Sequence, residues 1–362
     1  MLGGGFARNP YGTKPGFVET PMLLILNSIA HFLVDALCAA TVFGPVRASG
    51  DTALLILLYN TLAFSTQCLV GLAADRIRRH GWAASCALVL VAAGFVLPLP
   101  PVWRILFVGC GNSVFHVAGG SMTLEDSGGR AGPLGVFVAP GAIGVTLGML
   151  FPDWGWIYAP IAVLAAVLIV PLSTRRSPQS QTSGQREIPS PMLPVILLTL
   201  AVAVRAVGGS VVSFPWKTGV WLSLVLTLAV WAGKTAGGFV CDRLGPAKSA
   251  IVSIPAAALL IAFGSAWILP SLAGQFALNL TMPVTLWLLY RAMPDAPGFA
   301  FGLAASALWP GTIAGMLIPL TGPAAWILTL ASFLFGILAI LYSSKTIQRG
   351  EDSLPPEKES TI

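Results

Sequence analysis

The chain has 362 residues, of which 56% are hydrophobic and only 9% are charged, and its formal net charge is +6. A soluble globular domain carries about a quarter charged residues. Together with a mean hydropathy of +0.82, this composition excludes a soluble protein and predicts an integral membrane protein. The five cysteines stand singly along the chain, so the sequence indicates neither a disulfide framework nor a zinc site.

Apolar segments of about 20 residues recur along the chain, and a helix of that length crosses a hydrocarbon core of roughly 30 Å. Twelve are predicted, at 22–46, 53–73, 82–100, 102–123, 133–151, 155–173, 192–214, 219–240, 247–269, 271–291, 298–320 and 322–342. We therefore predict an all-α polytopic membrane protein. Its parts are an N-terminal segment (1–21), a six-helix bundle (22–173), a polar linker (174–191), a second six-helix bundle (192–342) and a tail (343–362).

The positions of Lys and Arg predict the orientation, because cytoplasmic loops retain positive charge. Most of the 20 Lys and Arg residues fall on one side of the membrane if the N-terminal segment is cytoplasmic. Both termini are then cytoplasmic, and we expect the protein in a bacterial inner membrane. Topology explains the net positive charge, so no nucleic-acid partner is expected. The lipid bilayer surrounds the protein, which we expect to be a monomer.

The first span carries two titratable residues, His31 and Asp35, which lie four residues apart and therefore on one face of a helix. A charge near the bilayer midplane costs several kcal/mol, so these side chains must face protein or water. The low dielectric there disfavours a charged carboxyl, and histidine changes charge near neutral pH. We predict a proton relay of His31, Asp35 and His116; the alternative is a structural hydrogen-bond network.

The two halves of the chain repeat each other at an offset of about 170 residues, which indicates two bundles of the same orientation. The matching positions are Asp35 with Arg205, Pro45 with Pro215, Ala139-Pro140-Gly141 with Trp309-Pro310-Gly311, and Gly71 to Arg76 with Gly238 to Arg243. The last pair has the form Gly-x-x-x-Asp-Arg and is expected in the loop between the second and third helices of each half.

These features resemble the major facilitator superfamily over essentially the whole chain, with the doubled Gly-x-x-x-Asp-Arg sequence as the most specific sign. The first half also resembles the fosmidomycin-resistance type of exporter. That likeness rests on His31-x-x-x-Asp35, on the stretch from Val108 to His116 and on Ser127-Gly-Gly-Arg130. The resemblance implies two six-helix bundles that rock about a central cavity lined by the first, fourth, seventh and tenth helices.

The resemblance also implies roles for the repeated loop sequence. Asp75 and Asp242 would hold the bundles together at the cytoplasmic side in one conformation, by capping a helix N-terminus or by pairing with arginine. We predict conformational-switch residues at both places: Gly71, Asp75, Arg76, Gly238, Asp242 and Arg243.

Polar residues in the four cavity-lining spans are candidate substrate ligands, namely Asn112, Arg205, Gln275 and Asn279, with Thr281 nearby. Arg205 has two interpretations: its planar guanidinium binds an anionic group of the substrate, or it pairs with Asp35 across the bundles. Lys234 is expected near the cytoplasmic end of its span, where it would reach toward the interface or pack against the loop; the alternative is contact with the substrate.

We predict a secondary transporter that moves a small organic solute, anionic, zwitterionic or a drug, by alternating access, with a proton gradient as the driving force. No Gly-x-x-x-x-Gly-Lys-Ser/Thr sequence is present, and no cofactor or enzymatic site is expected. A first alternative is a transporter of divalent transition metals held by His31, Asp35, Asn112 and His116. A second is a sensor or assembly factor that transports nothing.

Overall fold

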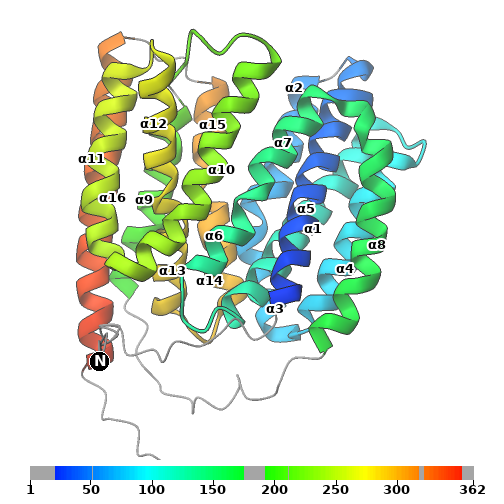
Figure 1. Cartoon of the computed structure of the whole chain (residues 1–362). Coiled ribbons are helices and arrows are strands. Elements are labelled where there is room, and N and C mark those ends of the chain that lie inside the picture. Colours follow the sequence, from blue (N-terminus) through cyan, green and yellow to red (C-terminus); the bar gives the residue numbers. More distant parts are fainter. Residues whose placement is uncertain (1–20, 51, 175–191, 211, 318–321, 353–362) are drawn as a thin grey trace, which may run out of the picture.

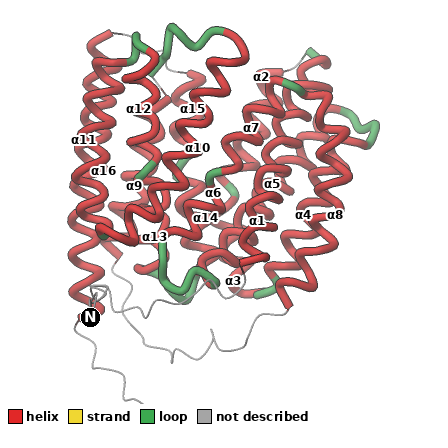
Figure 2. The backbone as a smooth tube through the Cα atoms, viewed as in Figure 1, coloured by secondary structure: helices red, strands yellow, loops and turns green. Residues whose placement is uncertain are grey.

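The computed structural model describes residues 21–50, 52–174, 192–210, 212–317 and 322–352. The predicted segments 1–20 and 175–191 and the end of the tail (353–362) lie outside these ranges. Every regular element of the described chain is helical (Figure 2), which confirms the predicted fold class.

The first half contains six rods, several of them made of consecutive helical pieces: α1 (Pro21–Thr41) with η1 (Val42–Val46) and η2 (Arg47–Ser49); α2 (Thr52–Asn60) with η3 (Thr61–Ser65) and α3 (Gln67–Ile77); α4 (His80–Val96); α5 (Pro101–Glu125); α6 (Gly132–Val138) with α7 (Pro140–Leu150); and η4 (Pro152–Trp154) with α8 (Gly155–Thr174).

The second half contains six more: α9 (Met192–Ser210); α10 (Gly219–Leu244); α11 (Pro246–Gly264); α12 (Ile268–Asn279) with α13 (Thr281–Ala292); α14 (Pro297–Ser306) with α15 (Trp309–Leu317); and α16 (Gly322–Asp352). The last helix, α16, continues past residue 342, where the apolar run ends. The polar segment that follows can stay helical because it contains no proline or glycine until Gly350.

Ten of these rods are long and apolar enough to cross a membrane. The other two among the described residues are α4, which has 17 residues, and the pair α14 and α15, which is interrupted at Ala307 and Leu308. The interruption precedes Pro310, and the one between α6 and α7 falls at Pro140. Both are repeat-related prolines, which lack the N–H that a continuous helix needs.

The halves stand side by side as two bundles (Figure 1), with α1–α8 from blue to green and α9–α16 from green to red. They touch through α3 and α14 and, on the other side of the molecule, through α6 and α10. The repeat is visible in the packing, because α7 lies on α1 as α15 lies on α9. A Cβ on Gly141 would meet Asp35, and a Cβ on its counterpart Gly311 would meet Ala206.

Two aspartates tie the bundles together reciprocally. The carboxylate of Asp75 accepts the backbone N–H groups of Gly298 and Phe299, at 2.7 and 2.8 Å, and so caps the N-terminus of α14. The carboxylate of Asp242 accepts those of Ala131 and Gly132, at 2.7 and 2.9 Å, at the start of α6. We call these two contacts the tethers. Helix capping and pairing with arginine were the two contacts expected for these aspartates, and each aspartate caps a helix.

The expectation that the Asp-Arg sequences lie in loops is wrong. Asp75 belongs to α3, which ends with Arg78 in a left-handed conformation (φ 54°), and Asp242 belongs to α10, which ends at Gly245 (φ 82°). The apolar residues of α3 and α10 end before the helices do, because the last turn of each helix lies at the polar boundary of the membrane. Arg76 and Arg243 are exposed, whereas the aspartates beside them are partly buried.

Glycines permit the close helix contacts at the tethers. A Cβ on Gly71 would collide with the backbone of Gly298, and a Cβ on Gly238 would collide with the backbone of Ala131. Larger residues at these positions would separate the helices that the tethers join. Gly71 and Gly238 therefore act through backbone proximity, while the adjacent aspartates supply the hydrogen bonds.

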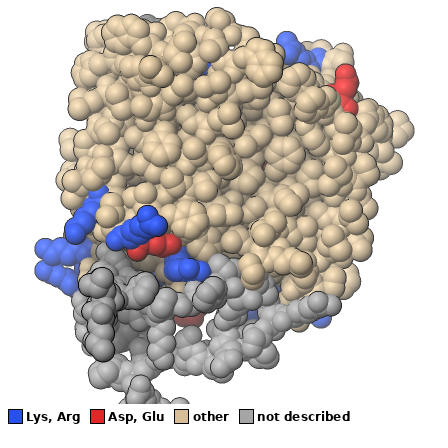
Figure 3. All heavy atoms as spheres, in the orientation of Figure 1, with Lys and Arg blue, Asp and Glu red and all other residues tan. Residues whose placement is uncertain are grey.

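On the face shown in Figure 3, charged side chains gather at the lower end, with a small group at the upper right and a wide uncharged band between them. Large apolar side chains are exposed on helices of both halves, among them Leu164, Val167, Leu259 and Phe263. An uncharged band with exposed apolar side chains is what a lipid-facing surface requires.

Candidate functional site

A cavity of about 440 Å³ lies between the two bundles, and both contribute side chains to its wall. It is lined by the rods that contain α1, α5, α9 and α13, as the resemblance implied, and also by those that contain η3, α7, α10 and α14. Two hydrogen bonds join helices of the two bundles. Thr146 Oγ1 on α7 lies 2.7 Å from Thr227 Oγ1 on α10, and Trp309 Nε1 on α15 donates to Thr61 Oγ1 in η3 at 3.3 Å.

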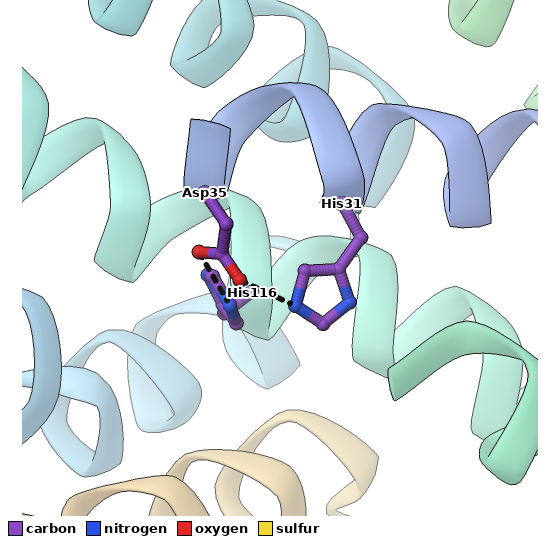
Figure 4. Close-up of side chains that lie close together, drawn as sticks. All are labelled: His31, Asp35 and His116. Atoms are coloured by element: carbon purple, nitrogen blue, oxygen red, sulfur yellow. Dashed lines mark ion pairs between the residues drawn. The ribbon is translucent and has the colours of Figure 1, made fainter. Parts of the chain in front are cut away.

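His31, Asp35 and His116 come together in the wall of this cavity (Figure 4). His31 Nε2 lies 3.3 Å from Asp35 Oδ2, and His116 Nε2 lies 3.5 Å from Asp35 Oδ1. The two imidazole rings meet edge to face with their centroids 4.4 Å apart. We call these three residues the His–Asp cluster. The predicted residues are thus neighbours, while their role as a relay stays a prediction.

The second nitrogen of each ring fixes the tautomer of both histidines. His31 Nδ1 lies 2.8 Å from the carbonyl oxygen of Phe137, and His116 Nδ1 lies 2.9 Å from that of Asn112. Because a carbonyl can only accept, each Nδ1 carries a hydrogen and donates it. A neutral imidazole of either residue therefore presents a bare Nε2 lone pair to the carboxyl group of Asp35.

With a deprotonated carboxylate and neutral rings, Asp35 and the two Nε2 atoms face one another with lone pairs only, at 3.3 and 3.5 Å. One proton placed on any of the three groups would convert one contact into a hydrogen bond, and a second proton would convert the other. The geometry therefore leaves two places for protons, and proton binding by the cluster stays a prediction.

Local chain features position the cluster. The interruption at Ala139 and Pro140 leaves carbonyl groups of α6 without helical partners, and the Phe137 carbonyl accepts from His31 instead. Gly141, at the start of α7, faces the cluster, and an added Cβ would collide with the Asp35 carboxylate and the His31 ring. The repeated Pro-Gly sequence is thus part of the site as well as of the fold.

Asn112 was expected to bind substrate; in this conformation it contacts Asp35, and its role as a substrate ligand stays a prediction. Its Nδ2 donates to Asp35 Oδ1 at 3.1 Å, its side chain is buried, and it does not line the cavity. It lies beneath the carboxyl group, one turn before His116 on α5. Asn112 therefore orients Asp35 from the protein side, and the His–Asp cluster faces the cavity.

Gln275 and Asn279 also do not line the cavity. Asn279 Nδ2 donates to the backbone oxygen of Gln275 at 2.8 Å, within α12. In a continuous helix these residues would share a face with Met282 and Leu286, which do line the cavity. The helix breaks at Leu280, between α12 and α13, and the break precedes Pro283, which lacks the N–H that a continuous helix needs.

Two cations of the second half lie in the wall. Arg205 on α9 donates to Thr281 Oγ1, and Lys234 on α10 has no hydrogen bond or ion pair among the described residues. The structure thus overturns the expectation that Lys234 reaches toward the cytoplasmic interface. Of the two interpretations of Arg205, the pair with Asp35 is absent from this conformation, in which Asp35 contacts His31, His116 and Asn112.

Comparison of the sequence with models of protein families gave no match, and comparison with curated proteins gave none either. Comparison of the structure gave many. A variant of the E. coli fucose:proton symporter FucP has a TM-score of 0.62 and 12% sequence identity, over 90% of this chain and 99% of that chain. A Major Facilitator Superfamily transporter structure, FucP in the outward conformation, has a TM-score of 0.61 and 12% identity, over 91% of this chain and 100% of that chain.

At this identity the likeness concerns the fold. The chain has the two-bundle fold of these major facilitator transporters, as the sequence resemblance implied. The fosmidomycin-resistance type of exporter is not among these similar structures, so that part of the sequence resemblance stays a prediction.

Proposed function

We propose that this protein is a secondary transporter that moves a small organic solute across the membrane by alternating access, coupled to protons. The observation that carries the proposal is a cavity of about 440 Å³ between two repeat-related bundles, with the His–Asp cluster in its wall. Cavities that bind small organic molecules have volumes of about 300 to 1,000 Å³. The cavity is therefore of a size for a metabolite or a drug.

The conformational change follows from the tethers. They fix the end of the molecule at which α14 and α6 begin, and the cavity lies on the other side of them. When the tethers break and the bundles rock, the cavity closes at its present end and opens at the tether end. With both termini cytoplasmic, as we propose from the positions of Lys and Arg, the tether end faces the cytoplasm and the structure is the outward-facing state.

Coupling follows from the cluster. In the outward-facing state Asp35 and the two histidines exchange protons with the cavity, and after the rocking motion they exchange them with the other side. A proton bound on one side is then released on the other only if the bundles move. Because the motion also carries the solute, the free energy of the proton gradient drives solute movement.

Reconstituted vesicles test this proposal directly. Purified protein in proteoliposomes containing a trapped pH dye is presented with monocarboxylates, dicarboxylates, amino acids, sugars and antibiotics in turn. We expect at least one class to move protons with wild-type protein. Asp35→Asn should abolish proton movement, whereas Asp153→Asn, which removes an exposed carboxylate in η4, should leave it intact.

Two results would contradict the proposal. One is that no solute class moves protons although the protein is folded and oriented in the vesicles. The other is that Asp35→Asn transports with an unchanged proton-to-solute ratio, because the cluster would then have no part in coupling.

The finer resemblance of the first half supports the proposal that the solute is an exported drug of the fosmidomycin-resistance type. Export driven by an inward proton gradient requires that the solute and the proton are not bound at the same time. Import requires that they bind together. Cells expressing the protein would show raised drug tolerance in the first case and solute accumulation in the second.

A divalent transition metal is the second candidate cargo, and one observation favours it. The side-chain ligand atoms of His31, Asp35 and His116 lie within 4.8 Å of one another. Both Nδ1 atoms donate to backbone carbonyls, which is the usual outer contact of metal-bound histidine. Vesicle uptake of Zn²⁺ or Co²⁺ that is lost in His31→Ala would support it. The large, mostly apolar cavity favours the organic solute.

A further inference from the structure

The second half contributes positive charge to the cavity without negative charge to match it. Arg205 and Lys234 both line the wall, and neither has a carboxylate within ion-pair distance in the described parts of the chain. The only hydrogen bond that Arg205 makes there goes to the neutral hydroxyl of Thr281. A guanidinium has five N–H donors, so most of its hydrogen-bonding capacity faces the cavity.

The cavity wall has more positive than negative charges. Asp35 is the one carboxylate of the wall, and it faces two histidines and lies within electrostatic range of Lys234. With both histidines neutral, the wall has one negative and two positive charges, a net charge of +1. Each proton taken up by the His–Asp cluster adds another. Buried charges in a low-dielectric wall require counter-charges, so the cavity lacks an anion.

The remainder of the wall is mostly apolar and includes Phe43, Ile56, Val145, Met282 and Leu308. A polyhydroxylated solute needs a hydrogen-bond partner for nearly every hydroxyl that it buries. The wall offers few uncharged polar groups. One is Gln67, whose Nε2 already donates to Ala63 O at 2.6 Å and whose Oε1 has no hydrogen-bond partner. The lining therefore suits an apolar body with a charged group rather than a sugar.

We propose that the cargo is an amphipathic organic anion held by Arg205 and Lys234. This inference rests on the proposed transport function and specifies its substrate class.

Calorimetry with matched aromatic probes tests the cargo class. Benzoate, phthalate and phenylphosphonate are the anions, benzylamine is the cation and benzyl alcohol is the neutral compound. We expect wild-type protein to bind at least one anion at least tenfold more tightly than the cation and the neutral compound. Lys234→Met and Arg205→Met should each weaken that anion by about tenfold or more, because each removes a buried charge partner.

Two further variants keep the charge test interpretable. Lys234→Arg retains the positive charge and should restore most of the affinity that Lys234→Met loses. Lys248→Met removes an exposed lysine of α11 and should bind the anion as wild type does. Tighter binding of the cation, or equal binding of all probes, would overturn the proposed cargo class.

Vesicle transport separates this inference from the proposed function. If the anions bind but neither they nor any other solute cross the vesicle membrane, the site is as described and the transport function fails. If solutes of another class cross with protons and the anions do not bind, transport stands and the inferred cargo class is wrong.

Discussion

The tether at Asp75 offers a direct test of how the two bundles are held, because a single substitution, Asp75→Asn, leaves the side-chain shape almost unchanged. The carboxylate accepts two backbone N–H groups of α14, at 2.7 and 2.8 Å. An asparagine has one accepting oxygen, and its amide N–H group would point at the second backbone donor. The substitution therefore removes the negative charge from the start of the helix and one of the two hydrogen bonds.

The size of the effect follows from the bonds lost. A hydrogen bond to a charged group contributes about 1.5–3 kcal/mol, and a neutral one about 1 kcal/mol. Because Asp75 is only partly buried and water can replace some of the contact, we take a loss of about 2 kcal/mol. That free energy corresponds to a roughly 30-fold change in the ratio of tethered to untethered conformations.

Spin-label distance measurements in reconstituted protein read out this ratio. Labels on noncanonical residues at Trp154 and Trp267 report on the end far from the tethers, and labels at Arg79 and Lys248 report on the tether end; all four positions are exposed. In Asp75→Asn we expect the far-end distance to shift toward shorter values and the tether-end distance toward longer ones.

The matched control is Asp295→Asn, which neutralises an exposed carboxylate in the loop that precedes α14. Its distance distributions should equal those of wild type. The reasoning is refuted if Asp75→Asn leaves both distances unchanged, or if the control moves them equally, since a general loss of negative charge would then explain the effect.

Two glycine substitutions extend the test to packing. Gly71→Ala places a Cβ against the backbone of Gly298, so it should destabilise the tethered state by about 1–3 kcal/mol and shift the same spin-label distances in the same direction as Asp75→Asn; unchanged distances would show that α3 and α14 can separate without cost. Gly141→Ala places a Cβ against Asp35 and His31, so it should abolish proton-driven uptake while the protein stays folded. Gly336→Ala on α16, where nothing lies within 4 Å of the added Cβ, should transport normally, and equal activity of the two variants would contradict the assigned role of Gly141.

The sequence predicted the architecture well because membrane spans have a strong signal. A segment that must bury every backbone hydrogen bond in lipid reads as about 20 apolar residues, whatever its packing partners are. Asp35 was identified for the same reason, since a carboxylate stands out in an apolar run, and so was its neighbour His31. The repeat then placed Gly141 and Gly311 at equivalent helix contacts before any coordinates were considered.

The details of the cavity wall were less predictable, because they depend on helix rotation. Gln275 and Asn279 lie before the helix break at Leu280, and Pro283 signals that break without telling how the two helical pieces are rotated. Lys234 looked like a boundary residue because it lies close to the tether sequence along the chain, yet it lines the cavity. Asn112 is one turn from His116 but lies behind Asp35. A polar residue in a span signals burial, and its partner is known only once the helices are packed.

The contact partners of the two tether aspartates also could not be chosen from the sequence alone. The resemblance implied that Asp75 and Asp242 hold the two bundles together, with a helix N-terminus or an arginine as the partner. The packing selects the helix N-terminus, because Gly71 and Gly238 bring the α14 and α6 backbones within reach while Arg76 and Arg243 point outward.

The most direct test of the central claim is the protonation of the His–Asp cluster, measured by nitrogen NMR on histidine-labelled protein in lipid. The chain has three histidines, and His80→Gln assigns the one outside the cluster. We predict that neutral His31 and His116 both carry their hydrogen on Nδ1, and that Asp35→Asn shifts the Nε2 resonances of both rings because both face that carboxyl group. Neutral rings with the hydrogen on Nε2, or Nε2 resonances unaffected by Asp35→Asn, would contradict the account.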